Sequence, residues 1–121
     1  MLIDTCTVAE LTTHIRELLE SDERLEDVWV EGEVSNLSKA ASGHLYFTLK
    51  DSGAQLKCVM WRSRVERQAS IPKNGDAVLV HGRVTVYDAR GEYQIDADRI
   101  RPLGVGNLFQ RFEELKARLY A

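Results

Sequence analysis

The sequence predicts an all-β core with flanking helices, built as a five-stranded Greek-key barrel over residues 27–103. Three observations predict this fold. Five short runs of strand-forming residues are separated by turn signals such as Asp51-Ser52-Gly53 and Asn74-Gly75. A polar, helix-like insert separates the third run from the fourth. Gly32 and Gly82 interrupt valine-rich runs, which favours curved barrel strands over a flat sheet packed on helices.

A helix is predicted ahead of the barrel, within an N-terminal helical segment of residues 1–26. Thr7 and Glu10 fit a capping box, in which each side chain satisfies a backbone amide at the start of a helix. Apolar residues then recur at helical spacing, which predicts a helix over residues 8–20. Residues 21–27 are polar and acidic, and they are predicted to form a connection.

The strands follow in order, and turn residues bound each of them. A short helix is predicted after the third strand, at residues 62–69. Residues 104–121 are predicted to form a C-terminal helix, because apolar residues recur at helical spacing from Asn107 onward. This pattern reaches the last residue without a stop signal, so we expect a longer protein. The predicted strands cover residues 28–37, 44–50, 54–61, 77–87 and 92–100.

Size and composition are those of an ordinary single-domain protein. The 121 residues are 44% hydrophobic and 29% charged, which is enough apolar material for one core. Cys6 and Cys58 match no metal or redox spacing, so Cys58 is interpreted as a buried hydrophobe in a reducing compartment. The chain has no run of about 18 apolar residues and no signal-peptide pattern at its start. We therefore expect no membrane partner and a cytoplasmic location.

The hairpin of residues 44–61 carries the strongest functional signal. Alternation along its strands gives one face that holds Tyr46, Lys50, Lys57 and Trp61. Rings offer stacking platforms for bases, and lysines attract phosphates, so this face is typical of a surface that binds single-stranded nucleic acid. The other face is apolar and is predicted to point into the core: Leu45, Phe47, Leu49, Leu56, Cys58 and Met60.

Further candidates come from the two loops that flank this face in an oligonucleotide-binding barrel. The connection at residues 36–43 and the turn at residues 87–93 both carry basic or aromatic groups. The basic residues are predicted to contact phosphates, and Tyr46 and Trp61 are predicted to stack on bases. The complete predicted nucleic-acid-binding set is Lys39, His44, Tyr46, Lys50, Lys57, Trp61, Arg62, Arg64, Arg83, Tyr87 and Arg90.

Several of these residues have a purely structural interpretation as well. Trp61 could cap the barrel end or pack beneath residues 62–69, and His44 could be an ordinary polar residue at a strand end. Trp29, outside the predicted set, could pack on the N-terminal helix. The aromatic face is also typical of protein–protein interfaces, so an interaction or homo-oligomerisation module is the alternative function.

Charge is distributed unevenly along the chain. The net charge of −3 argues against a strongly basic nucleic-acid binder. However, residues 1–33 contain ten acidic and two basic residues, whereas residues 34–103 contain eleven basic and seven acidic ones. The basic surplus therefore falls on the predicted barrel. The sequence shows no phosphate-binding glycine loop, no metal-ligand spacing and no context for a nucleophile. We therefore expect this fragment to be non-catalytic alone and to need no cofactor.

Several motifs resemble one known family. They are Val28–Asn36, Ser42–Asp51, Gly82–Val84, Tyr87 and Arg90–Gln94. Together they are similar to the N-terminal oligonucleotide-binding (OB-fold) domain of the large subunit of bacterial exodeoxyribonuclease VII, over residues 7–119. The resemblance implies a domain that binds single-stranded DNA and presents it to a downstream nuclease domain, which cleaves the DNA to oligonucleotides.

The resemblance also implies properties of the longer protein. The parent enzyme is a single-strand exonuclease, a hydrolase whose partner is a small helical subunit. Its catalytic domain lies beyond residue 121, so no catalytic residue is assigned in this chain. Residues 104–121 are then a helix that leads toward that domain. The acidic surplus of residues 1–33 is not explained by the family pattern.

Overall fold

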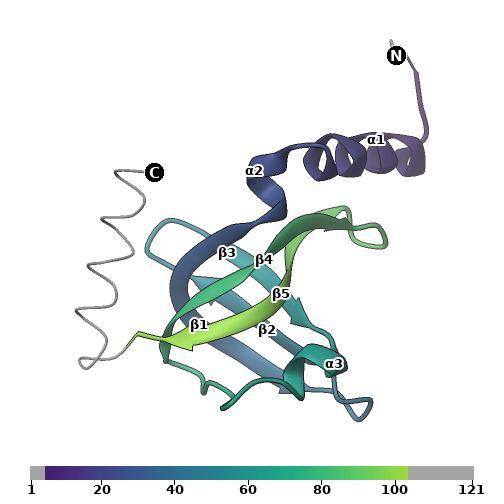
Figure 1. Cartoon of the computed structure of the whole chain (residues 1–121). Helices are drawn as coiled ribbons and strands as arrows, with labels where there is room; N and C mark the ends of the chain where they lie inside the picture. Colours follow the sequence, from purple (N-terminus) through teal and green to yellow (C-terminus); the bar gives the residue numbers. More distant parts are fainter. Residues whose placement is uncertain (1–4, 104–121) are drawn as a thin grey trace.

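The computed structural model describes residues 5–103 and shows a closed five-stranded barrel with a helix beside it (Figure 1). The strands follow one another around the barrel in the order β1-β2-β3-β5-β4. The predicted five-stranded OB-fold barrel and N-terminal helix are confirmed, whereas the predicted C-terminal helix lies outside the described residues. The elements are α1 (Val8–Glu20), α2 (Glu23–Glu26), β1 (Val28–Lys39), β2 (Leu45–Lys50), β3 (Gln55–Met60), α3 (Arg62–Val65), β4 (Ala77–Tyr87) and β5 (Glu92–Pro102).

The barrel closes through one long curved strand and one short parallel pair. The long strand β1 pairs with β2 along one half and with β4 along the other. The parallel pair joins β3 to β5 over only three residue pairs, from Lys57–Gln94 to Val59–Asp96. The beginnings of β3 and β5 are therefore joined by no ladder, which leaves the barrel surface open between them.

Two glycines allow strands to approach closely, as the sequence pattern indicated. A Cβ atom on Gly82 would lie 2.2 Å from the backbone oxygen of Asp96, at the bulge between β4 and β5. A Cβ atom on Gly32 would lie 2.7 Å from Cγ of Leu49. Real side chains do not reach such distances, so only glycine fits where the strands bend over the core.

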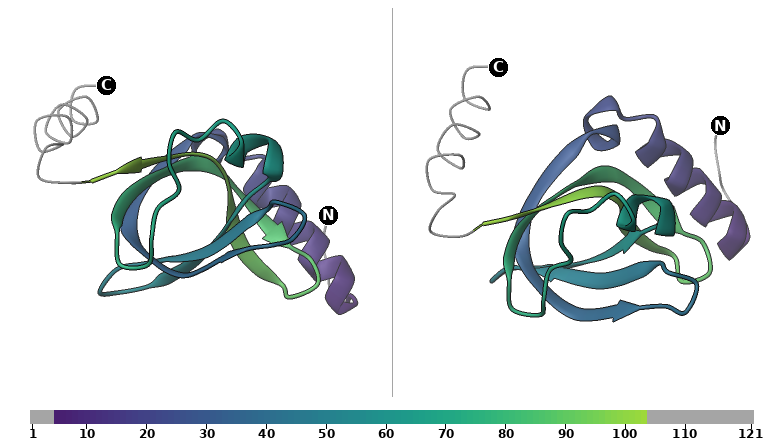
Figure 2. Two further views of the ribbon diagram at one scale, coloured as in Figure 1. Left: turned by 90° about the horizontal axis from the view of Figure 1, so that it is seen from below. Right: turned by 60° about the horizontal axis from the view of Figure 1, so that its bottom comes forward.

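The core is formed by the inward faces of the strands. Leu45, Phe47 and Leu49 of β2 are buried, and so are Cys58 and Met60 of β3, as predicted from alternation. Seen along its axis, the barrel forms a ring, with α1 outside it against β4 (Figure 2). α3 contributes Val65, which is buried in the same core cluster.

Several element boundaries differ from the sequence expectation, and those of β2 and β3 do so by a single residue. β1 continues two residues past Leu37, because its register with β2 shifts between Ser35 and Ser38 and pairing then resumes. Asn36 adopts φ 52° at this shift, a conformation that Asn tolerates better than most residues. The short helix after β3 ends at Val65 instead of residue 69, and β5 continues to Pro102. The connection at residues 21–27 includes the short helix α2.

α1 is capped and is attached to the hairpin formed by β4 and β5. The predicted capping box is present, with Thr7 Oγ1 accepting from the Glu10 amide and Glu10 Oε1 accepting from the Thr7 amide. Arg16 forms an ion pair with Asp88 in the hairpin turn. The Thr85 hydroxyl of β4 donates to Glu20 at 2.8 Å. These contacts hold an acidic helix beside the hairpin. No helix within residues 5–103 is long and apolar enough to cross a membrane.

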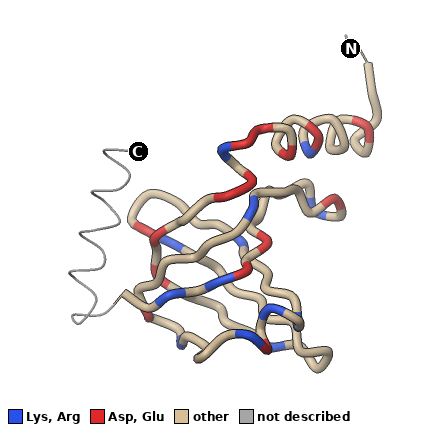
Figure 3. Tube along the Cα trace, in the orientation of Figure 1, with Lys and Arg blue, Asp and Glu red and all other residues tan. Residues whose placement is uncertain are grey.

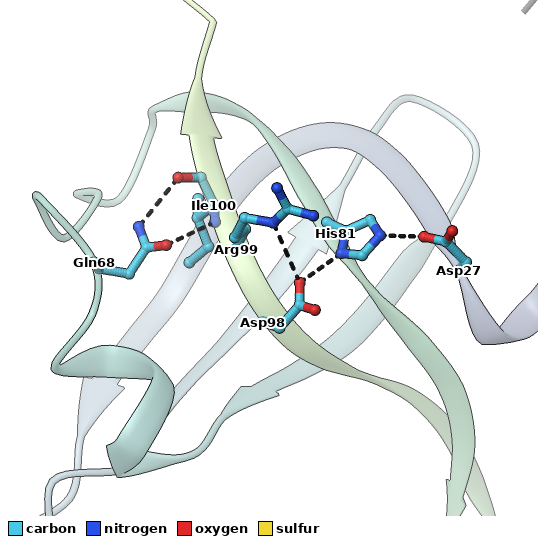
Figure 4. A network of polar contacts seen from close by, with 6 residues as sticks. All are labelled: Asp27, Gln68, His81, Asp98, Arg99 and Ile100. Atoms are coloured by element: carbon cyan, nitrogen blue, oxygen red, sulfur yellow. Dashed lines mark hydrogen bonds and ion pairs between the residues drawn. The ribbon is translucent and has the colours of Figure 1, made fainter.

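A polar network joins α2, β4 and β5 on the outside of the barrel (Figure 4). Both ring nitrogens of His81 contact carboxylates, Nε2 that of Asp27 and Nδ1 that of Asp98. Trp29 packs against His81, with 4.7 Å between the ring centroids, and Arg101 lies 4.5 Å above the Trp29 ring. The ring contacts of Trp29 are thus made with strands β4 and β5.

A side-chain amide in the segment after α3 is hydrogen-bonded to the backbone of β5. Gln68 Nε2 donates to the backbone oxygen of Ile100 at 3.1 Å, and the Ile100 amide donates to Gln68 Oε1 at 3.0 Å (Figure 4). The Gln68 side chain therefore substitutes for a neighbouring strand at this edge of β5.

Candidate nucleic-acid interface

A cleft of about 490 Å³ lies on the outer surface of β2 and β3 and against the β4–β5 hairpin. Thr48 of β2 and Val59 of β3 face outward yet are only 4% and 3% exposed, so they lie at the bottom of the cleft. The lining residues are Asn36, Tyr46, Phe47, Thr48, Lys57, Cys58, Val59, Trp61, Tyr87, Arg90, Glu92 and Gln94.

Three aromatic rings of the cleft are accessible to a ligand. Tyr46 is 42% exposed, Trp61 43% and Tyr87 46%. Tyr46 and Trp61 lie at one end of the hairpin of β2 and β3, and Tyr87 approaches from the end of β4. Rings from three separate elements therefore line one open cleft, where planar groups can stack on them.

Lys57 and Arg90 are the cations of this cleft. Lys57 projects from β3, and Arg90 projects from the turn between β4 and β5. The Arg90 guanidinium lies over the Tyr87 ring, with Cζ 5.7 Å from the ring centroid. Stacking of this kind orients a guanidinium and leaves its N–H groups available for an anion.

Arg64 and Arg83 lie beyond Trp61, in a neighbouring hollow of about 330 Å³. Trp61 lines both this hollow and the cleft, so its ring stands between the two. Arg83 forms an ion pair with Asp96, 3.7 Å between Nη2 and Oδ2. Glu26 and Asp98 also line the hollow, so its charge is mixed whereas the cleft carries two cations and one carboxylate.

Four of the predicted residues lie outside both concavities: Lys39, His44, Lys50 and Arg62. His44 supports Trp61 from the side, with the two rings edge to face at 5.0 Å. His44 Nδ1 also accepts a hydrogen bond of 2.9 Å from the Arg62 amide, at the start of α3. His44 is therefore in a position to orient the tryptophan, and Lys39 and Lys50 sit at the ends of β1 and β2.

Four polar residues of the cleft were missed by the sequence reasoning: Asn36, Thr48, Glu92 and Gln94. Glu92 and Gln94 are two positions apart on β5 and thus share a face. Gln94 Nε2 donates to Asp96 Oδ1 at 3.1 Å. A signal was present for Glu92 and Gln94, because both belong to the segment Arg90–Gln94 and Gln94 precedes the buried Ile95. The prediction included only basic and aromatic residues together with His44.

Many of the acidic residues lie outside the cleft lining. Figure 3 shows Asp and Glu along α1 and α2, and both acidic and basic residues on the strands and turns of the barrel. In this acidic segment Asp22 accepts hydrogen bonds from Arg24, chiefly from its side chain, which lowers the pKa of the exposed carboxyl. Among residues 5–103, no group of three or more His, Cys, Asp or Glu side chains could hold a metal ion.

Comparisons with known proteins agree with this geometry. The model of one protein family, described as an OB-fold nucleic acid binding domain, matches residues 6–101. The chain is 52% identical over 113 residues to the exodeoxyribonuclease 7 large subunit of Geobacter metallireducens, covering 93% of this chain and 24% of that protein. It is 47% identical over 116 residues to the same subunit of Bordetella avium, covering 96% and 25%. The chain thus spans about a quarter of the length of these relatives.

Solved structures show the same fold. A replication protein A heterotrimer bound to ssDNA superposes with a TM-score of 0.58 at 23% identity, over 80% of this chain and 75% of that one. The SSB domain of a Synechococcus protein superposes with a TM-score of 0.51 at 16% identity, over 66% and 98%. At these identities the likeness establishes the barrel fold.

Proposed function

This chain belongs to the family of OB-fold nucleic acid binding domains, in the form found in the N-terminal part of exodeoxyribonuclease 7 large subunits, and we propose that its cleft binds single-stranded DNA. In the longer protein, the domain presents this DNA to a downstream nuclease domain, which cleaves it to oligonucleotides. The small subunit of that enzyme is the proposed partner of the full-length protein, in the cytoplasm. The isolated domain is proposed to be non-catalytic.

One observation carries the proposal: three exposed rings and two cations without ion-pair partners surround a single cleft. Within residues 5–103, no ion pair engages Lys57 or Arg90, and the rings of Tyr46, Trp61 and Tyr87 are roughly half accessible. Stacking is worth about 1–3 kcal/mol per base in single-strand binders, and lysine or arginine neutralises phosphates. All five residues belong to the predicted nucleic-acid-binding set, and all five line the cleft.

A fluorescence titration tests DNA binding directly. A Trp29→Phe variant leaves Trp61 as the single tryptophan, and we expect its emission to be quenched when a base stacks on the ring. The affinity for a single-stranded oligonucleotide should fall as salt rises, because neutralised phosphates release counterions. A Trp61→Ala chain should bind about fivefold to a hundredfold more weakly, which corresponds to the loss of one stack. Binding that is independent of salt and of Trp61 contradicts the proposal.

The alternative function, a protein-interaction module, rests on the same exposed rings. A double variant, Tyr46→Ala with Trp61→Ala, separates the two functions. If the double variant loses self-association, measured by sedimentation, while it keeps its DNA affinity, the face is a homo-oligomeric interface. If it loses DNA affinity and remains monomeric like the parent chain, the face is a DNA-binding surface. Incubation of the chain with single-stranded DNA and Mg²⁺ tests for cleavage by the isolated domain.

A further inference from the structure

The geometry points to a base preference within the proposed DNA cleft: we propose that it favours cytosine over uracil or thymine, because Glu92 and Gln94 present acceptors to a bound base. The inference rests on the proposed function. It concerns which edge of the base the cleft recognises, whereas the rings and cations of the cleft attract any single strand.

Glu92 brings an available carboxylate into the cleft. It lies at the start of β5, paired in register with Tyr87, whose ring lines the same cleft. In the described part of the chain, no ion pair or hydrogen bond engages the Glu92 side chain. The two neighbouring carboxylates already have cationic partners, because Asp88 forms an ion pair with Arg16 and Asp96 forms one with Arg83. Glu92 is exposed, so water satisfies it in the free protein. An ionised carboxylate only accepts hydrogen bonds, so a ligand group that displaces this water must be a donor.

Gln94 adds a second acceptor on the same face of β5. Its Nε2 donates to Asp96 Oδ1 at 3.1 Å. The reverse orientation of the Gln94 amide would place its oxygen against the Asp96 carboxylate, and two acceptors cannot form a hydrogen bond. The nitrogen of the amide therefore faces Asp96. The amide oxygen of Gln94 then remains as an acceptor, two residues from Glu92 in a cleft that both residues line.

The charges of the cleft favour a base, and not a phosphate, at Glu92. Glu92 repels a phosphate, whereas Lys57 and Arg90 attract one, so the phosphates avoid Glu92 and a base edge can occupy that place beside Gln94. Cytosine offers an amino group to such acceptors, and acidic side chains commonly accept from it. Uracil and thymine offer a carbonyl oxygen at the equivalent position, which leaves two acceptors facing each other. Cytosine therefore satisfies the site and uracil does not.

The test compares short fluorescent oligo(dC) and oligo(dU) of equal length at neutral pH and one salt concentration. These pyrimidines stack similarly and differ at the amino or carbonyl group, so stacking is held constant. We expect the native chain to bind oligo(dC) about 5- to 10-fold more tightly, the lower end of the range for one specific base contact because the cleft is open. Glu92→Gln should reduce the ratio of the affinities for oligo(dC) and oligo(dU) to about 1–2. The glutamine amide can donate to the carbonyl oxygen of uracil as well as accept from the amino group of cytosine. Glu17→Gln on α1 removes one exposed charge that does not line the cleft, and it should leave the ratio of the two affinities unchanged.

The outcomes separate this inference from the proposed function. Equal binding of both oligonucleotides, with salt dependence and loss in Trp61→Ala, overturns the base preference and leaves the DNA-binding proposal standing. A preference for oligo(dC) that persists in Glu92→Gln overturns the role of Glu92. Absence of binding to either oligonucleotide overturns the proposed function and the preference together.

Discussion

Cys58 shows how burial determines the chemistry of one residue. The side chain is 3% exposed in the core, and desolvation raises the pKa of its thiol to about 12 from an ordinary value of 9.0. Burial disfavours the thiolate, the form that reacts with electrophiles. Cys58 is therefore unreactive in the native state, in line with its interpretation as a buried hydrophobe.

We predict that Cys58 reacts with a thiol reagent only when the protein unfolds. A Cys6→Ser variant isolates Cys58, and its labelling at mildly alkaline pH should follow the unfolding transition. The raised pKa also makes stability depend on pH. Between pH about 9 and 12, the thiol of the unfolded chain has lost its proton, whereas the buried thiol of the native protein has kept it. The free energy of unfolding therefore decreases as the pH rises through this range. The stability contributed by the neutral thiol is fully present only below pH about 9. Rapid native labelling of Cys58 would contradict this account.

Gly82 is a second residue whose environment permits a sharp prediction. An added methyl group would lie 2.2 Å from the Asp96 backbone oxygen, and a backbone atom cannot move aside as a flexible side chain can. We expect Gly82→Ala to lower the free energy of unfolding by about 1–3 kcal/mol or more through overpacking. Gly53→Ala is the matched control, because its added Cβ would lie 3.6 Å from Asp51 Oδ1, an ordinary contact. Urea denaturation of both variants measures the difference, and equal stabilities would show that β4 and β5 can separate at no cost.

At the scale of elements, α1 is attached to the β4–β5 hairpin by polar contacts of Arg16 and Glu20. No residue of α1 is buried, and Leu11 and Leu18 are largely exposed. An isolated helix of this length is marginal in water, so its capping box and its contacts with the β4–β5 hairpin contribute a large share of its stability. The helix is therefore expected to open more readily than the barrel strands.

We predict that Thr7→Ala destabilises α1 by about 0.5–2 kcal/mol, because the Thr7 hydroxyl that accepts the hydrogen bond from the Glu10 amide is lost. Amide hydrogen exchange should accelerate within residues 8–20 and stay unchanged in β2 and β3. Thr13→Ala, within the same helix, removes no capping contact and should slow exchange slightly through higher helix propensity. Equal acceleration throughout the barrel would show that α1 and the barrel unfold as one unit.

At the scale of the whole molecule, the charge distribution explains how an acidic protein can bind DNA. The net charge is −3, yet the acidic surplus lies in residues 1–33, the segment that includes α1 and α2 (Figure 3), and the cations of the cleft lie on the barrel. Charges separated by more than about 8–10 Å are screened at physiological salt, so local cations govern phosphate binding more than the net charge does.

Removal of one cleft cation should therefore change the salt dependence of DNA binding by a defined amount. We predict that Lys57→Gln and Arg90→Gln each reduce the slope of log affinity against log salt by about 0.7, the value for one phosphate contact with a single strand. Lys39→Gln, which lies outside the cleft, should leave the slope unchanged. Titrations at three or more salt concentrations provide the slopes. If Lys39→Gln changes the slope and Lys57→Gln does not, the phosphates are bound at another surface.

Much of the fold could be predicted from the sequence, because its determinants are local. Alternation assigned the inward faces of β2 and β3, and the capping box and apolar spacing located α1 at Val8–Glu20. The ends of β1 and α3 were misjudged, since a register shift near Asn36 and the Gln68 contact with Ile100 depend on chain that is distant in sequence. Local patterns carry no information about such partners.

The sequence by itself determined which side of each strand carries rings, cations and apolar groups, because side chains alternate along any extended backbone. Only the tertiary structure decided which of those groups share a cleft. Closure through the parallel pairing of β3 with β5 brings Lys57 to the same surface as Glu92 and Gln94. Lys39 and Lys50 remain outside the cleft, although they lie at the ends of the neighbouring strands β1 and β2. Proximity across the barrel depends on the register between strands that are far apart in the chain, and no periodicity within one strand encodes that register.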